Sequence, residues 1–249
     1  MKRTAGMRGK GPARKINMPT LGGYLRTLSV PMPRSYDVSA EIPDYSMASN
    51  DVLGTSVLAS VVNVLQLAYN EVGEYFPIPS SWEVESAYSE LDKNDDGNVC
   101  IADALDHWME HGLFGTKISA YVPVDIKNRR EISRACFEFG TVILGAEMPE
   151  NAEGQFNAGE PFYLSELEFP HAQGHSMVAT GYNRFGIDIV TWGSTESLTW
   201  SWWERYGSEA WIVIPEFLTE IYEDSVWGLD ILTIQKDIQN ARLPNHQSS

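Results

Sequence analysis

Segment 57–72 restricts the fold of this chain more than any other. Apolar side chains cover most of the circumference of a helix built from it and leave only a thin polar stripe of Asn63, Gln66 and Asn70. A helix of this kind is stable only when other elements surround it. The chain has 249 residues, of which 43% are hydrophobic, so it can supply a surrounding core in one domain. We therefore expect a long, central, buried helix.

Hydrophobic periodicity changes halfway along the chain. Up to about residue 139 helical patterns dominate, and beyond it short apolar or alternating runs are typical of strands. Helices are expected at 81–91, 101–111, 128–139 and 233–241, and strands at 117–124, 141–147, 174–182, 186–192 and 209–214. Helices that precede strands in this way are typical of the α+β class.

Charge is divided between the N-terminus and the rest of the chain. Eight basic residues precede the first acid, Asp37, whereas the whole chain has 34 acidic residues and a net charge of −16. Segment 1–15 has no helical or strand period and predicts a flexible basic arm, and the proline-rich segment 16–49 predicts an extended wrap over the body. We expect region 1–34 to bind an acidic protein surface, and nucleic acid only through the arm if at all. A solubilising tail is the alternative.

Several classes of protein are disfavoured by simple counts. Cys100 and Cys136 are too few for a secreted disulfide framework, and the chain does not open with a signal-peptide pattern. It has no run of 18 apolar residues, so we expect no membrane span.

Three segments carry chemistry. "GHSMVATGY" at 174–182 places His175 at the start of a predicted strand, and "TWGS" at 191–194 forms a corner after the next strand. "NDVLGTS" at 50–56 leads into the central helix and puts Ser56 in its first turn. A helix N-terminus can activate a nucleophile with a histidine as base, although Ser56 is also an ordinary N-cap residue for a core helix.

These segments, together with "WWERYGSEAWIVI" at 202–214, resemble those of papain-like cysteine peptidases. They are most similar to a group of phage-encoded papain-like proteins with the ordered motifs NDxxGDC, GGHxxxxxGY, VTWG and YxxRY. The resemblance covers about 11–234 and implies a central helix packed on an antiparallel sheet. It implies a papain-like domain at 50–214, with a helical half at 50–139 and a sheet half at 140–214, followed by a C-terminal helix and tail at 215–249.

The resemblance also assigns site positions. Ser56 stands where the family has its nucleophilic cysteine, His175 where it has the base, Thr191 where papain has the orienting asparagine, and Asn50 where papain has the oxyanion-hole glutamine. A serine hydroxyl is far less acidic than a thiol, so Ser56 needs a general base that a third group holds in place. Thr191 accepts a hydrogen bond but brings no charge. We therefore expect an inactive site.

Two functions remain open on this reading. The first is a catalytically inactive papain-like virion structural protein, made in the host cytoplasm, whose arm anchors it to neighbouring subunits of a homo-oligomer or larger assembly. The second is an active hydrolase, either a maturation peptidase or a cell-wall amidohydrolase, with residue 56 as nucleophile and His175 as base. A cysteine enzyme in which Ser56 is an introduced replacement is a variant of the second. Activity requires Ser56 Oγ about 2.6–3.2 Å from His175 and an open groove above them.

Segment 92–103 has oxygen side chains and a glycine at the spacing of a calcium loop. It lacks the bidentate glutamate, because its last position is an aspartate. An acidic turn with helix capping is the alternative, and we expect no other cofactor. The candidate ligands are Asp92, Asn94, Asp96, Asn98 and Asp103.

Overall fold

The structure is a computed structural model that describes residues 9–10, 13–14, 16–25, 31–92, 98–167, 169–222 and 229–242. The helices are α1 (Leu21–Tyr24), α2 (Asn50–Leu53), α3 (Ser56–Glu71), α4 (Ser81–Leu91), α5 (Ile101–Glu110), α6 (Arg129–Phe139), α7 (Ala152–Ala158), α8 (Trp200–Tyr206), α9 (Glu216–Tyr222) and α10 (Ile231–Arg242), with a 3-10 turn η1 (Ser39–Glu41). The strands are β1 (Gly9–Lys10), β2 (Tyr36–Asp37), β3 (Asn98–Val99), β4 (Ile118–Pro123), β5 (Val142–Pro149), β6 (His171–Tyr182), β7 (Gly186–Thr191), β8 (Ser194–Thr199) and β9 (Gly207–Pro215).

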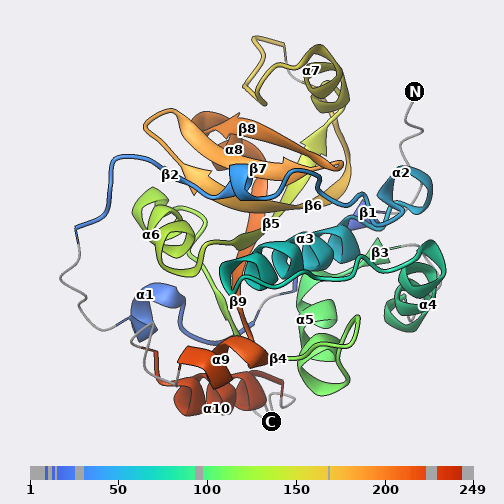
Figure 1. Cartoon of the computed structure of the whole chain (residues 1–249). Helices are drawn as coiled ribbons and strands as arrows, with labels where there is room; N and C mark the ends of the chain where they lie inside the picture. Colours follow the sequence, from blue (N-terminus) through green and yellow to red (C-terminus); the bar gives the residue numbers. More distant parts are fainter. Residues whose placement is uncertain are drawn as a thin grey trace, which may run out of the picture.

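The predicted α+β fold is confirmed. Seven strands form an antiparallel sheet in the order β4-β9-β5-β6-β7-β8, with β2 added to β6. Helix α3 crosses the middle of the molecule and packs on β6, with α4 and α5 on one side and α6 at its far end (Figure 1). The central helix begins at Ser56, and nearly all of its residues up to Ala68 are buried.

The polar stripe of α3 binds the segment that precedes the domain. Gln66 accepts a hydrogen bond from the Ser46 backbone N–H at 3.1 Å and donates one to the Asp44 carbonyl at 3.0 Å. Asn70 donates to the Glu41 carboxylate at 3.1 Å. Gln66 thus satisfies backbone groups of the segment before α2, and Asn70 holds the same segment through a side chain. Asn63, the third stripe residue, is itself buried.

The corner between β7 and β8 is a two-residue hairpin turn. Trp192 and Gly193 both have positive φ, at 48° and 69°, and Thr191 pairs with Ser194 across the turn. Both residues of a type I′ turn need this left-handed conformation. Strand β8 was not predicted, because its sequence STESLT is polar and it lies at the edge of the sheet. Trp192 therefore belongs to the turn and not to the strand predicted at 186–192.

The two ends of the described chain meet on α5. The Asp106 carboxylate accepts hydrogen bonds from Arg14 at 2.5 Å, from Arg242 at 2.8 Å and from the Tyr121 hydroxyl. One acidic side chain therefore joins the N-terminal segment, helix α10 and strand β4.

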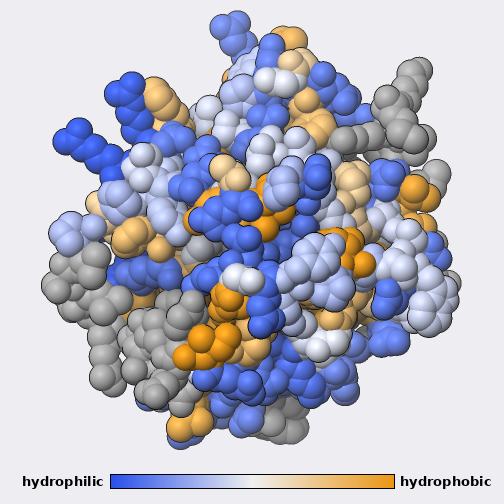
Figure 2. Space-filling model, viewed as in Figure 1, coloured by the Kyte–Doolittle hydropathy of each residue, from blue (hydrophilic) through white to orange (hydrophobic). Residues whose placement is uncertain are grey.

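Among the described helices, none is both long and apolar enough to cross a membrane. On the face shown in Figure 2, hydrophilic residues predominate and apolar ones lie in small separate groups.

Candidate functional site

The loop before α3 fixes the position of Ser56. Ser49 and Gly54 have the left-handed conformation, with φ of 58° and 67°, so α2 is separated from α3 by a sharp change of direction. Thr55 donates a hydrogen bond from Oγ1 to the Ala48 carbonyl at 2.6 Å and closes the loop. Ser56 then begins α3 and is only 2% exposed.

His175 lies in β6 and is 3% exposed. Its Nε2 is 2.8 Å from Oγ1 of Thr191, the last residue of β7, so the structure brings these two predicted site residues together. The Trp192 ring lies 5.0 Å from the His175 ring, between centroids, and Phe156 and Phe162 pack edge-on against that tryptophan. The imidazole is therefore covered by Trp192, against which the two phenylalanines pack in turn.

Burial determines the protonation state of His175. The charged imidazolium loses its hydration in this enclosure, and the pKa falls from 6.5 to about 4. The side chain is therefore neutral at pH 7. Its hydrogen-bond partner Thr191 carries no charge that would favour the protonated form.

Ser56 makes its hydrogen bond with the residue next to the histidine. Its Oγ accepts from the Ser176 backbone N–H at 3.2 Å. Ser176 Oγ is 2.8 Å from Ser60 Oγ, and Ser60 in turn donates to the Ser56 carbonyl at 3.0 Å. A hydroxyl has a single hydrogen, so Ser176 must donate to Ser60. Within the described part of the chain, no hydrogen bond joins Ser56 to His175.

The Ser60–Ser176 contact was missed by sequence reasoning. Ser60 stands four residues after Ser56 and so lies on the same helix face, and Ser176 directly follows His175. These spacings were visible, but only the packing of α3 on β6 shows that the two faces meet. All three serines are at most 3% exposed. They form a buried polar link between the helical and sheet halves.

Asn50, the predicted oxyanion residue, opens α2 in the loop that leads to Ser56. It is 9% exposed, and its backbone N–H donates to the Met47 carbonyl at 2.8 Å. Its side chain makes no hydrogen bond with Ser56 or His175 in the described structure. The structure thus brings Asn50 into the same loop without a direct contact to the other candidates.

Part of the predicted basic arm pairs with the body. Gly9 and Lys10 form β1, which runs parallel to β3 and lies close to both α3 and β6. Figure 1 shows β1 near the end of α3 that begins with Ser56. The backbone of this short strand therefore lies beside the two elements that carry Ser56 and His175.

The predicted calcium loop is only partly described. Asn94 and Asp96 lie outside the described residues. Of the other candidates, Asp92 caps the end of α4, Asn98 belongs to β3, and Asp103 forms an ion pair with Arg14 at 2.5 Å. Within the described ranges, no three His, Cys, Asp or Glu side chains are grouped to hold a metal. Calcium binding stays a prediction.

Comparisons with known proteins bear on this arrangement. No family model and no curated protein sequence matches the chain. Among solved structures, xylellain, a cysteine protease from Xylella fastidiosa, is similar with a TM-score of 0.63 over 86% of this chain and 98% of its own, at 13% identity. The fold is papain-like. A proCathepsin B from Trypanosoma congolense is similar with a TM-score of 0.60 and 11% identity over 84% of this chain and 87% of its own. The digestive procathepsin L 3 of Tenebrio molitor is similar with a TM-score of 0.58 and 11% identity over 82% of this chain and 76% of its own. The structural similarity shows the papain-like fold. Because the sequence identities are low, the activity of this chain has to be argued from its own site.

Replacing Thr191 with valine tests the contribution of the histidine contact in this papain-like fold. Valine has nearly the same shape and suits a strand, but it leaves the buried Nε2 of His175 without a partner. We expect a loss of about 2 kcal/mol in the free energy of unfolding, measured by urea denaturation. Thr191→Ser keeps the hydroxyl and should lose clearly less. Equal losses in both variants would contradict the importance of this hydrogen bond.

Proposed function

We propose that this chain is a catalytically inactive papain-like protein that serves as a structural component of a phage particle. The hydrogen bond of Ser56 is the observation that carries the proposed inactivity. Ser56 Oγ accepts from the Ser176 N–H and is buried, so the atom that would attack a carbonyl is engaged inside the core. The proposed phage setting comes from the sequence resemblance.

The chemistry of the site supports the same proposal. A serine nucleophile needs a base that removes its proton and a third group that stabilises the resulting imidazolium. Here the pKa of His175 is lowered to about 4 by burial, and its Nε2 faces the neutral Thr191. Among the described residues, no acidic group offsets the cost of burying an imidazolium at this position. The arrangement lowers the basicity that a serine mechanism requires.

An active hydrolase is the second candidate, and one observation favours it. The His175–Thr191 hydrogen bond and the Trp192 ring over the imidazole are the contacts expected of an oriented base. For activity, the Ser56 hydroxyl or a thiol at position 56 would have to donate its hydrogen to His175, and no hydrogen bond joins these two residues in the described structure. A rearrangement that forms this bond would also have to open the buried site to a substrate.

A Ser56→Cys variant distinguishes these candidates. An activated cysteine reacts rapidly with iodoacetamide because it is a thiolate, whereas a buried neutral thiol does not. We expect residue 56 to stay unmodified in the folded variant and to be alkylated after denaturation in guanidinium, as measured by peptide mass spectrometry. Rapid alkylation of the folded variant that His175→Ala abolishes would support the hydrolase.

The structural role is tested on purified particles. We expect mass spectrometry of the phage that encodes this chain to find it in intact particles, in amounts comparable with other structural proteins. Charge supports such an anchoring role, because eight of the 18 basic residues precede Asp37, the first acidic residue, and the chain from Asp37 onward is strongly acidic. Deleting residues 1–8 should reduce its incorporation, and deleting residues 243–249 serves as the control. A chain found only free of particles would contradict the proposal.

A further inference from the structure

An exposed aromatic segment follows helix α3. Tyr75 and Trp82 are 79% and 74% exposed, and Ile78 between them is 39% exposed. Trp82 is the only exposed tryptophan among the described residues. Large apolar side chains gathered on a surface mark interaction sites, and tryptophan and tyrosine are enriched among the residues that contribute most to binding. We call Tyr75, Ile78 and Trp82 the aromatic strip.

The aromatic strip is held in place by the body of the protein. Phe76, which lies within the same segment, is buried and packs on Tyr69 of α3, with ring centroids 5.3 Å apart. Pro77 and Pro79 restrict the backbone on either side of Ile78. A segment that is already ordered loses little conformational entropy when a partner covers it. The strip is therefore suited to bind a partner without rearrangement.

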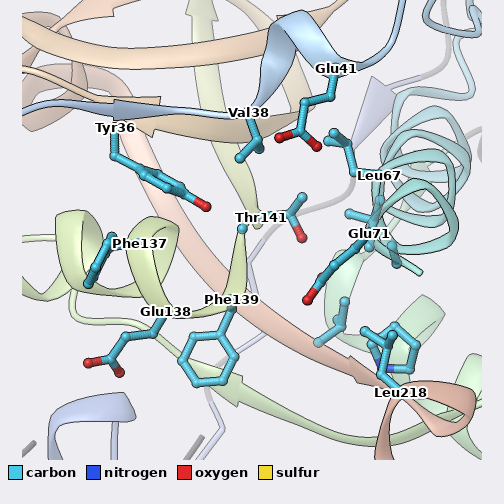
Figure 3. Close-up of a pocket in the computed structure, with 15 residues that line it drawn as sticks. Tyr36, Val38, Glu41, Leu67, Glu71, Phe137, Glu138, Phe139, Thr141 and Leu218 are labelled. Carbon is cyan, nitrogen blue, oxygen red and sulfur yellow. The ribbon is translucent and has the colours of Figure 1, made fainter. Parts of the chain in front are cut away.

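The charge around the aromatic strip is negative. Residues 35–92 include no lysine and no arginine. Glu74 and Glu85 are exposed beside the strip and form no ion pair with any described residue. Where the strip begins, the carboxylates of Glu41 and Glu71 lie around a cavity of about 240 Å³ at the end of α3 (Figure 3). These charges favour a partner that brings cations.

A basic surface stands out on the otherwise acidic body. Of its four cations, one is paired, because Arg129 binds Glu204 at 2.7 Å, and the other three form no ion pair with any described residue. An exposed phenylalanine lies among them. We call this surface the arginine patch, and it consists of the exposed residues Lys127, Arg129, Arg184, Phe185 and Arg205.

Contacts between three elements hold the arginine patch together. The guanidinium carbon of Arg129, at the start of α6, lies 5.6 Å from the centre of the Trp200 ring at the start of α8. The Trp200 backbone N–H donates to the Phe185 carbonyl in the β6–β7 turn at 3.1 Å. In that turn the guanidinium carbon of Arg184 lies 4.3 Å from the centre of the Phe185 ring. The start of α6, the β6–β7 turn and α8 therefore form one continuous region.

We propose that the aromatic strip of one copy of this chain binds the arginine patch of a second copy. Guanidinium groups stack on the faces of tryptophan and tyrosine rings, and the carboxylates of Glu74 and Glu85 pair with the remaining cations. The two surfaces complement each other in charge and in aromatic character. A polyanion would suit the patch alone, but the net charge of −16 opposes its approach.

The two surfaces lie on different sides of the molecule. The aromatic strip ends on α4 and the arginine patch begins on α6, and these helices lie on opposite sides of α3 (Figure 1). Contact between two different surfaces is heterologous, so each added copy leaves one surface free and further copies add head to tail. This association goes beyond the proposed function, because it uses neither Ser56 nor residues 1–8 and needs only the purified protein.

Sedimentation velocity of the full-length protein over a range of concentrations tests the proposal. We expect larger species as the concentration rises and their loss at high salt, which screens the charged contacts. Trp82→Ala and Arg184→Glu should each weaken the association about tenfold or more. Leu232→Ala and Lys236→Glu change an exposed apolar side chain and an exposed cation on α10, outside both surfaces, and should leave the association unchanged.

Mixing the two interface variants guards against an effect on folding. Trp82→Ala keeps the arginine patch and Arg184→Glu keeps the aromatic strip, so the mixture should form one-to-one dimers at concentrations where neither variant associates alone. Larger species should not form, because no intact surface remains on such a dimer. The proposal is overturned if the unaltered protein is a monomer at every concentration and its surfaces serve other partners. Undiminished association of either variant, or a mixture that stays monomeric, would also overturn it.

Discussion

Replacing Asp106 with alanine should lower the free energy of unfolding by about 3 kcal/mol, because it leaves two guanidinium groups and a buried hydroxyl without their shared acceptor. Burial alone would raise the pKa of Asp106. Hydrogen bonds from Tyr121, Arg14 and Arg242, together with the charge of Arg14, outweigh burial and hold that pKa below its ordinary value. The carboxylate is therefore charged at neutral pH and stabilises the junction.

A neighbouring acid on the same helix is a matched control. Asp103 pairs with Arg14 at 2.5 Å, but its side chain is 47% exposed whereas that of Asp106 is 18% exposed. Exposed ion pairs contribute little, so Asp103→Asn should cost less than about 1 kcal/mol. Guanidinium denaturation of both variants measures the difference. If Asp106→Ala cost no more than Asp103→Asn, the junction of the two chain ends would not be a main source of stability.

Acidification should destabilise the protein through His175. In the unfolded chain the histidine takes up a proton below a pKa of about 6.5, whereas in the folded protein burial lowers that pKa to about 4. Between these values the unfolded state binds more protons, so stability falls as the pH falls from about 6.5 to about 4. The full difference corresponds to about 3 kcal/mol.

Urea denaturation at several pH values measures this effect in the unaltered protein and in His175→Gln. The variant should lose the part of the acid sensitivity that comes from the buried imidazole. His111→Gln changes a histidine whose side chain is 66% exposed, and it should follow the unaltered protein. The same pH dependence in His175→Gln and in the unaltered protein would show that His175 is not held neutral in the folded state.

The fold was predictable because its main determinants are local. The apolar pattern of segment 57–72 predicted a central helix. The change of hydrophobic period near residue 139 predicted a sheet after it. Strand β8 escaped prediction because an edge strand needs few apolar residues. Helix α7 (Ala152–Ala158) is short, and only two of its residues are buried, so its pattern gave little signal.

The candidate site was predictable only as a set of positions. The order of the motifs predicted His175 and Thr191 as site residues. In the structure His175 Nε2 lies 2.8 Å from Thr191 Oγ1. The partner of Ser56 could not be predicted, because it is a backbone N–H whose position depends on how α3 packs against β6.

A serine-reactive fluorophosphonate probe tests the central claim most directly, that this papain-like fold holds a buried and inactive site. Intact-protein and peptide mass spectrometry would follow the reaction in the unaltered protein, Ser56→Ala and His175→Ala, with a known serine hydrolase as positive control for the probe. The account predicts no modification of Ser56 in the folded protein, because its Oγ is buried and hydrogen-bonded to the Ser176 N–H. Modification of Ser56 that disappears in His175→Ala would contradict it.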